Sequence, residues 1–311
     1  MGGGLSGGGM VVVARGVACA LAVWSVACDA TAGDVLTALG DAGDGRADAR
    51  AAVDAAATPD GGGADAGGCA AMVDGPCPAP GGVGITVCGR VLDVEDTSIV
   101  PGGGTVTVRF FNAVDFPGGP SLAEATPDAC GWFVAQGVTG LIPGLLVLTT
   151  DDAGAGDVYE PVLTIVPAST GSAVRVNAYT LRADTDRAWS AAAGLGGATF
   201  SDMGALALIF LDASQPPLFP FLSGRPAAGV TITEGGTPQP GDDYYFADGG
   251  PLSRSVLSPA AGATGANGSG LLIGTQPLQE YGGQRAGCTF GTAKGVGPGV
   301  VQIQELYGTC N

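Results

Sequence analysis

The side chains that carry most enzyme chemistry are scarce in this chain of 311 residues. It contains no histidine, so the commonest general base, proton shuttle and transition-metal ligand is absent. Nucleophiles activated by histidine are therefore excluded, and carboxylates alone would have to carry any acid–base reaction. No pair of carboxylates stands out by its spacing. We predict that the protein is not an enzyme and holds no cofactor.

Acidic side chains nevertheless cluster in two segments that follow expected strands. Clusters of oxygen ligands suit calcium, which accepts loose geometry. Solvated turns have the same composition, and we favour that interpretation and predict no metal site. The two clusters are Asp151, Asp152, Asp157 and Glu160, and Asp242, Asp243 and Asp248.

An aromatic run, Tyr244-Tyr245-Phe246, adjoins the second cluster. In a strand, alternate side chains point to opposite faces, so an outward ring could stack on a sugar or an apolar side chain. The interpretation we favour is that these rings cover the sheet.

The N-terminal residues have the pattern of an export signal. From Met10 the chain reads MVVVARGVACALAVWSVACDA, in which Arg15 precedes an apolar run that ends at Ala27. This run is shorter than the ~20 residues that a permanent membrane span needs. We predict that residues 1–28 are a signal peptide, with Met10 as a candidate for the true start.

The end of this signal carries a candidate lipidation site. Ser25-Val26-Ala27-Cys28 resembles the lipobox of bacterial lipoproteins, although Ser25 replaces the usual leucine. The resemblance implies a lipid on Cys28, a place in the cell envelope, anchored in the outer membrane, and membrane contact only through that lipid. The alternative is cleavage after Ala32, which would give a secreted protein.

Six cysteines remain beyond the signal, and an even set in an exported chain predicts three disulfides. The sequence alone does not fix their pairing. Proximity along the chain favours Cys69–Cys77, Cys88–Cys130 and Cys288–Cys310.

Residues 29–68 consist almost entirely of Asp, Ala, Gly and Thr. Such a segment cannot bury enough apolar surface to offset the entropy of ordering, so we predict a disordered tether. The formal net charge of the chain is −17, which repels nucleic-acid phosphates and excludes nucleic acid as an electrostatic partner.

The rest of the chain is expected to be mainly β. Runs of alternating or β-branched residues are bounded by Gly, Pro or Asp, which is the signature of strands and hairpins. At least five short strands between residues 83 and 167 predict a β-sandwich, and we place a first module at 69–170. A second module is expected at 204–311.

The connector at 171–203 is expected to contain a short helix. Asp184 and Asp186 lie at its start and Gly194 follows its end, which fits helix electrostatics and capping. Trp189 is expected in the core between the modules.

Three segments of the first module resemble carboxypeptidase regulatory-like, or transthyretin-like, β-sandwich modules: Cys88–Asp93, Gly104–Val108 and Asp128–Phe133. Residues 204–311 resemble a diverged second copy, although the segment between Asp212 and Gly224 departs from the pattern. The resemblance implies two tandem sandwiches in a bacterial lipoprotein. We therefore predict a surface-tethered binding or structural protein whose partner is an envelope protein or glycan. The alternative is an accessory module that contacts the substrate of an exported enzyme.

Overall fold

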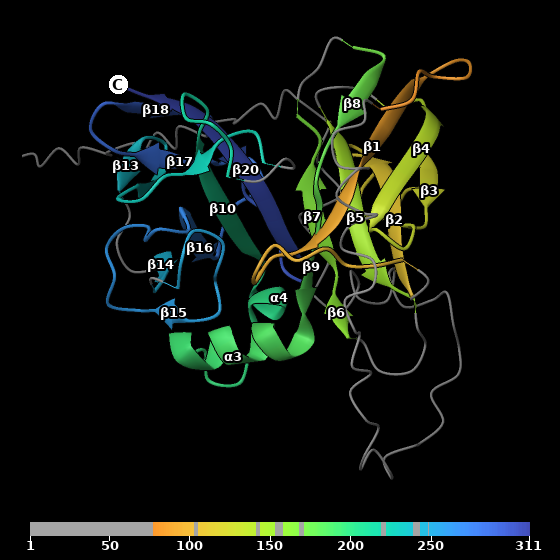
Figure 1. The fold of residues 1–311 in the computed structure, drawn as a ribbon. Coiled ribbons are helices and arrows are strands. Elements are labelled where there is room, and N and C mark those ends of the chain that lie inside the picture. Colours follow the sequence, from red (N-terminus) through yellow and green to blue (C-terminus); the bar gives the residue numbers. More distant parts are fainter. Residues whose placement is uncertain are drawn as a thin grey trace, which may run out of the picture.

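The structure is a computed structural model, and the described part of the chain is mainly β, as predicted (Figure 1). The predicted signal peptide, Cys28, the tether and Cys69 lie outside the described residues. These are 77–102, 105–140, 144–152, 158–167, 171–218, 222–238, 243–247 and 249–311.

The first half of the described chain contains nine strands before its first helix. They are β1 (Ile85–Asp93), β2 (Val106–Asn112), β3 (Ala123–Ala125), β4 (Trp132–Val138), β5 (Leu145–Asp151), β6 (Tyr159–Glu160), β7 (Val162–Ile165), β8 (Ala173–Arg175) and β9 (Ala178–Arg182).

The predicted helix is confirmed as α3 (Ala183–Ala193). It ends at Gly194, which has a φ of 75° and donates its backbone N–H to the Ala191 carbonyl. Glycine adopts this left-handed conformation without steric cost, so the helix stops there. A second helix, α4 (Phe200–Met203), begins with a capping box between Thr199 and Asp202.

The second half of the chain contains the remaining described strands. They are β10 (Ala205–Asp212), β11 (Arg225–Pro226), β12 (Thr231–Glu234), β13 (Thr237–Pro238), β14 (Asp243–Phe246), β15 (Leu257–Ser258), β16 (Ser269–Ile273), β17 (Glu280–Gln284), β18 (Cys288–Phe290), β19 (Ala293–Lys294) and β20 (Val301–Cys310).

One large sheet runs through both halves. Its strand order is β15-β14-β16-β10-β20-β7-β5-β2-β3. The connection is made by β20, which pairs in parallel with β10 along its length and with β7 at Val301 and Gln302. The two regions expected as tandem sandwiches therefore share a continuous hydrogen-bonded sheet.

A second sheet covers the first half of this large sheet. Its order is β4-β1-β9-β6, with β8 also paired to β1. Val87 and Phe133 from this sheet are buried against Val108, Phe110 and other apolar residues of the large sheet. This packing forms the predicted β-sandwich.

The second half buries both faces of β10, which has no exposed residue. Leu206, Leu208 and Phe210 face a third sheet, of order β13-β12-β17-β19. The alternate residues, such as Ile209, face α3, α4 and the ends of β1 and β9. A strand that is apolar on both faces fits the middle of a layered fold, because side chains alternate between the faces.

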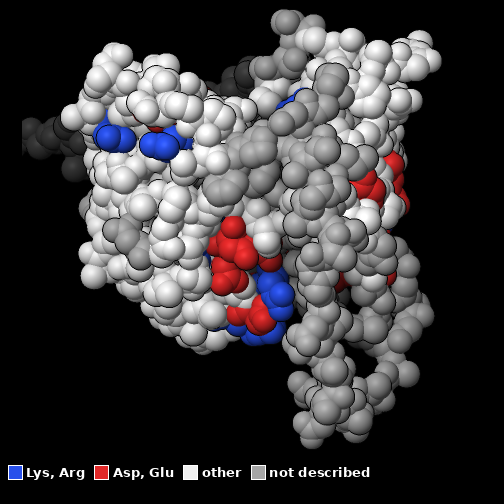
Figure 2. All heavy atoms as spheres, viewed as in Figure 1, with Lys and Arg blue, Asp and Glu red and all other residues white. Residues whose placement is uncertain are grey.

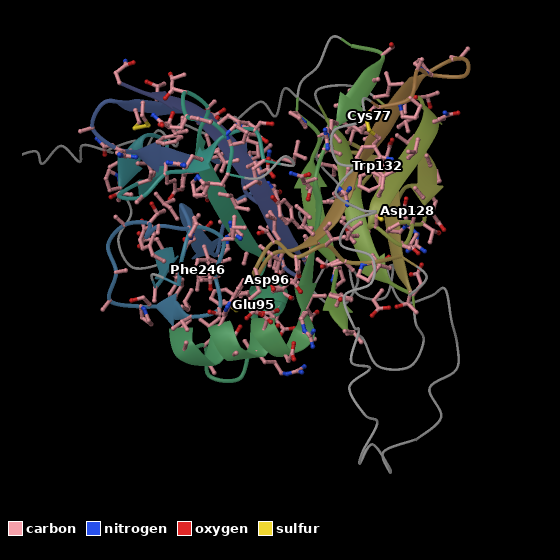
Figure 3. The ribbon with its side chains drawn as sticks, in the orientation of Figure 1. Cys77, Glu95, Asp96, Asp128, Trp132 and Phe246 are labelled. Carbon is pink, nitrogen blue, oxygen red and sulfur yellow. A yellow bond between two sulfur atoms is a disulfide. The ribbon has the colours of Figure 1, made fainter. Side chains whose placement is uncertain are left out.

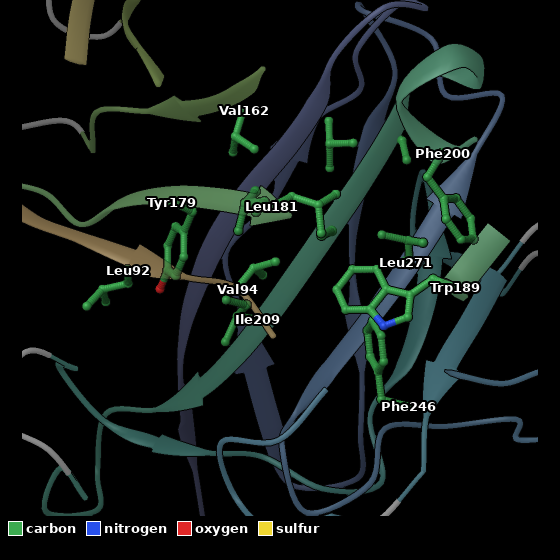
Figure 4. Packing of buried hydrophobic residues seen from close by; sticks show 14 of the residues in the cluster. Leu92, Val94, Val162, Tyr179, Leu181, Trp189, Phe200, Ile209, Phe246 and Leu271 are labelled. Atoms are coloured by element: carbon green, nitrogen blue, oxygen red, sulfur yellow. The ribbon is translucent and has the colours of Figure 1, made fainter. Parts of the chain in front are cut away.

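Trp189 lies at the centre of this helix-covered core, as expected. It is 2% exposed, and its ring meets that of Phe246 edge-on with 4.8 Å between centroids (Figure 4). Leu92 and Tyr179 from the first half belong to the same cluster. Burying one such side chain stabilises the fold by ~1.5–3 kcal/mol, so this cluster joins the halves strongly.

Two disulfides are defined among the described residues. Cys288–Cys310 joins neighbouring positions of β18 and β20, as sequence proximity predicts. The other bond is Cys77–Cys88, so the predicted pairs Cys69–Cys77 and Cys88–Cys130 are wrong. In the ladder Cys88 pairs with Val134, four residues after Cys130. At ~3.3 Å per residue that offset exceeds the reach of a disulfide. Cys130 is itself disulfide-bonded.

Candidate functional site

The predicted acidic clusters do not form a metal centre among the described residues. Asp152 pairs with Arg109 at 2.7 Å, and Asp151 accepts a hydrogen bond from the Val158 backbone at 3.1 Å. Asp157, Asp242 and Asp248 lie outside the described part. Within that part, no three ligating side chains are grouped around a possible ion.

The aromatic run belongs to the core of the second half. Tyr245 is fully buried, and its hydroxyl donates to Asp243 at 2.7 Å and accepts from the Ile232 backbone at 2.9 Å. Tyr244 is half-buried and packs edge-on against Phe200. These rings cover the sheet and offer no flat stacking surface.

Another set of polar residues, which the sequence did not single out, gathers where the halves join. A cavity of about 140 Å³ opens there, between β7, the β8–β9 segment and β20. We call it the Glu305 pocket. It is lined by Thr164, Ile165, Pro167, Arg175, Val176, Asn177, Tyr179, Ser223, Gln304, Glu305 and Tyr307.

Strand periodicity directs the polar side chains into this pocket. On β20, Val301 and Ile303 enter the core, and Glu305 and Tyr307 continue the same face beyond its edge. Across the junction, Arg175, Asn177 and Tyr179 alternate with Val174, Val176 and Ala178, which face the core of the first half. One face of each strand therefore changes from apolar to polar at the pocket.

The Glu305 carboxylate is the centre of the pocket's hydrogen bonds. Its Oε1 accepts from Asn177 Nδ2 at 2.8 Å and from the Tyr179 hydroxyl at 2.5 Å. Its Oε2 accepts from the Tyr307 hydroxyl. A carboxylate has about four lone-pair sites, so these three donors leave one acceptor position on Oε2.

Both tyrosines keep their protons at neutral pH. Burial, reinforced by the negative charge of Glu305, raises the pKa of Tyr179 well above its usual range. The same two causes, in the same order, raise the pKa of Tyr307. The hydroxyls therefore act as hydrogen-bond donors that hold the carboxylate in place.

A buried cation lies behind this network. Arg254 is 1% exposed, and it interacts electrostatically with Tyr179 and Glu305. Its guanidinium donates to the Val94 carbonyl at 2.9 Å and to Ser269 Oγ at 2.7 Å. The Arg254 charge compensates part of the negative charge of the carboxylate.

The rim and wall of the pocket carry further polar groups. The exposed Arg175 guanidinium lies over the Trp132 ring, 5.5 Å from its centroid, and Figure 3 shows Trp132 on the outer sheet of the first half. Thr164 is 4% exposed, and its hydroxyl has no hydrogen-bond partner among the described residues. Tyr307 is 37% exposed, so its ring forms part of the mouth.

A separate group of acids lies on the loop that follows β1 (Figure 3). Figure 3 labels Glu95 and Asp96 on the loop after β1, and Figure 2 shows acidic and basic side chains together in this area. Glu95 accepts from the Thr185 hydroxyl at 2.6 Å, and Asp96 accepts from the Ser98 backbone at 2.8 Å. The first bond ties the loop to α3 and the second lies within the loop, so both are structural.

The polar side chains of the pocket are hydrogen-bond donors and acceptors. The pocket contains no cysteine or histidine, and its tyrosines are held in the neutral form. A side chain whose pKa does lie near neutrality is Asp93, which burial raises to about 6, but Asp93 does not line the pocket.

Comparisons with known proteins assign no family. No family model matches the chain, and no curated protein matches it. Two solved structures of mutant forms of the shaft pilin SpaA from Lactobacillus rhamnosus GG align with 73% of this chain. The double mutant is 10% identical over an alignment that covers 97% of its own chain, with a TM-score of 0.20. A single mutant is 11% identical over an alignment that covers 98% of its own chain, with a TM-score of 0.21. Likeness at this level carries no functional argument, and the resemblance to transthyretin-like modules stays a prediction.

In the described part of the chain, no helix is both long and apolar enough to cross a membrane.

Proposed function

We propose that this chain is a non-catalytic protein of the bacterial cell envelope that binds an envelope component through the Glu305 pocket. The observation that carries the proposal is the arrangement of Glu305 itself. Its carboxylate lines the cavity and is held by one amide and two tyrosine hydroxyls, from both sides of the junction. Groups fixed in this way are preorganised to bind.

The sequence supports the exported part of the proposal. The apolar run before Cys28, the lipobox-like residues and the acidic segment 29–68 together describe a lipid anchor followed by a spacer. The two disulfides fit an oxidising compartment. Identification of the two β regions as carboxypeptidase regulatory-like modules is part of the same proposal and is supported by their motifs.

The proposal is tested by expressing the full chain in a Gram-negative host and separating membrane, periplasm and medium. A lipid-sized mass increase on Cys28 in the membrane fraction is expected. Cleavage after Ala32 with release into the medium would replace the anchored form by a secreted one, and a chain kept in the cytoplasm would refute the export proposal.

Binding is tested by sedimentation with purified cell envelopes from the same host. The chain with Cys28→Ala, which carries no lipid anchor, is expected to sediment with them, and the same chain with Glu305→Gln is expected to remain in solution. Glu280→Gln in the same chain serves as the control, because Glu280 is an exposed carboxylate that pairs with Lys294 outside the pocket. Equal sedimentation of all three proteins would refute a role for the pocket.

A further inference from the structure

We infer that the Glu305 pocket accepts one neutral sugar ring, a single hydroxyl-rich unit of an envelope glycan. This inference rests on the proposed function and adds the chemical class of the ligand. It is carried by the size of the cavity, by its mixture of polar and apolar walls, and by the balance of charge around it.

The cavity has room for a single ring. Its volume is about 140 Å³, well below the ~300–1,000 Å³ of pockets that enclose drug-sized ligands. A longer oligosaccharide would have to extend past the rim, where Arg175 and Tyr307 lie. The pocket therefore binds one sugar unit of a glycan, either within the glycan or at its end.

The polar groups match a ring that carries several hydroxyls. A hydroxyl both donates and accepts hydrogen bonds. The remaining acceptor position on Glu305 Oε2 fits a donating hydroxyl, and the guanidinium of Arg175 at the rim fits an accepting one. The amide of Gln304 also lines the cavity.

The apolar lining fits the C–H face of such a ring. Ile165 and Pro167 contribute aliphatic surface, and the Tyr307 ring stands at the mouth. A wall that joins aliphatic surface to fixed polar groups is typical of small-ligand sites. A purely hydrophilic ion would leave these walls unused.

The charges around the pocket select a neutral ligand. Glu305 repels an acidic sugar, and the net charge of −17 acts in the same direction. Arg175 at the rim and the buried Arg254 behind Tyr179 oppose a cationic one. An uncharged ring satisfies the hydrogen-bonding groups without an unpaired charge.

The test uses the full chain purified after export, with its disulfides intact. Glucose, galactose, mannose and N-acetylglucosamine are titrated by calorimetry and by saturation-transfer NMR, beside glucuronate and glucosamine as charged probes. At least one neutral sugar is expected to bind, and neither charged probe is expected to bind better. Glu305→Gln is expected to weaken binding about 10-fold or more, because a hydrogen bond to a charged acceptor is lost.

Two further variants keep the test decisive. Tyr307→Phe removes one hydroxyl that holds the carboxylate and is expected to weaken binding several-fold, while Glu280→Gln is expected to bind as the wild type does. The unfolding temperature of each variant shows whether it is folded. Absence of binding to every neutral sugar, stronger binding of a charged probe, or unchanged binding by folded Glu305→Gln would overturn the inference.

The inference and the proposed function fail separately. Envelope binding that depends on Glu305 but that none of the four sugars competes for would leave the proposed function standing and refute the sugar ring. Sugar binding without envelope binding would support the sugar ring and refute the proposed binding to the envelope.

Discussion

Two carboxylates of this protein accept several hydrogen bonds each, yet their surroundings differ. Asp186 on α3 is fully buried and accepts from the backbone of Phe200 and Ser201 and from the hydroxyls of Ser190 and Ser201. Its partners lie within fifteen residues of it. Glu305 is half-buried, and two of its three donors, Asn177 and Tyr179, lie more than one hundred residues away, while the third, Tyr307, is on the same strand. Asp186 joins the neighbouring helices α3 and α4. Glu305 joins β20 to the β8–β9 segment beside the cavity.

Asp93, at the end of β1, is a third case. It is 7% exposed and accepts a hydrogen bond from the Glu95 backbone at 2.9 Å. Burial is the main reason that its pKa rises to about 6, and the neighbouring Asp96 and Glu95 add to the rise. The three sites differ in the number of hydrogen-bond donors around the carboxylate and in how far away along the chain those donors lie.

The largest effect is expected at Asp186. Asp186→Ala leaves the backbone N–H of Ser201 buried without its acceptor and removes one of the two acceptors of the Phe200 N–H, together with the acceptor of two serine hydroxyls, so the free energy of unfolding should fall by ~3–5 kcal/mol. Urea unfolding followed by tryptophan fluorescence measures this, because Trp189 lies in the same helix. Asp184→Ala, on the exposed side of α3, is the matched control and should change stability by less than ~0.5 kcal/mol. An equal loss of stability in Asp186→Ala and Asp184→Ala would contradict the structural role of Asp186.

The next effect is a dependence on pH that comes from Asp93. Between about pH 4 and 6 the folded protein keeps a proton that the unfolded chain has released, because the folded-state pKa is the higher one. This contribution to stability is therefore complete below about pH 4 and is lost as the pH rises to about 6. Its size is ~2–3 kcal/mol.

Asp93→Asn should remove that part of the slope and make the protein relatively more stable at pH 7 than the wild type. Urea midpoints from pH 4 to pH 7 provide the measurement. Asp115→Asn, at an exposed turn, should leave the slope as it is. A wild-type stability that stays flat across this window would contradict the role of Asp93.

A smaller loss of stability is expected at Glu305. Glu305→Gln keeps an acceptor for Asn177 and Tyr179 but weakens the charge-assisted bonds, so unfolding should become easier by only ~1–2 kcal/mol. Binding should suffer more than folding. A loss as large as that of Asp186→Ala would show that Glu305 is chiefly a structural tie.

The smallest effect is expected for Tyr307→Phe. The Tyr307 residue is 37% exposed, so the change in stability should stay below ~1 kcal/mol. Differential scanning calorimetry compares the unfolding of Tyr307→Phe with that of Tyr179→Phe. The hydroxyl of Tyr179 is fully buried, and its removal should cost more than the removal of the Tyr307 hydroxyl.

Local patterns in the sequence predict the local structure well. Alternation and turn residues predicted the β regions, and the acids before Trp189 with Gly194 behind it predicted α3. The disulfide partners of Cys88 and Cys77 were wrong because nearness in sequence does not fix strand register. Pairing of β20 with β7 joins residues that are far apart along the chain, and no local pattern contains it.

The pocket was missed for a related reason. Glu305 lies in a run, Gln302-Ile303-Gln304-Glu305, that reads as an ordinary strand with polar residues. The available signal is that Glu305 shares a face with the apolar Val301 and Ile303, and an acid on a core-facing side is unusual. Its donors Asn177 and Tyr179 cannot be recognised before the topology is known.

The position of β20 also affects the order in which the protein can be made. It follows every other described strand in the sequence, yet it lies between β10 and β7, where it closes the sheet. During synthesis or passage across a membrane, the earlier strands emerge first and wait with open edges on either side of the gap. The native sheet is completed only when the last ten-residue strand arrives. The full stability of the sheet that joins the two halves therefore depends on the described strand that is made last.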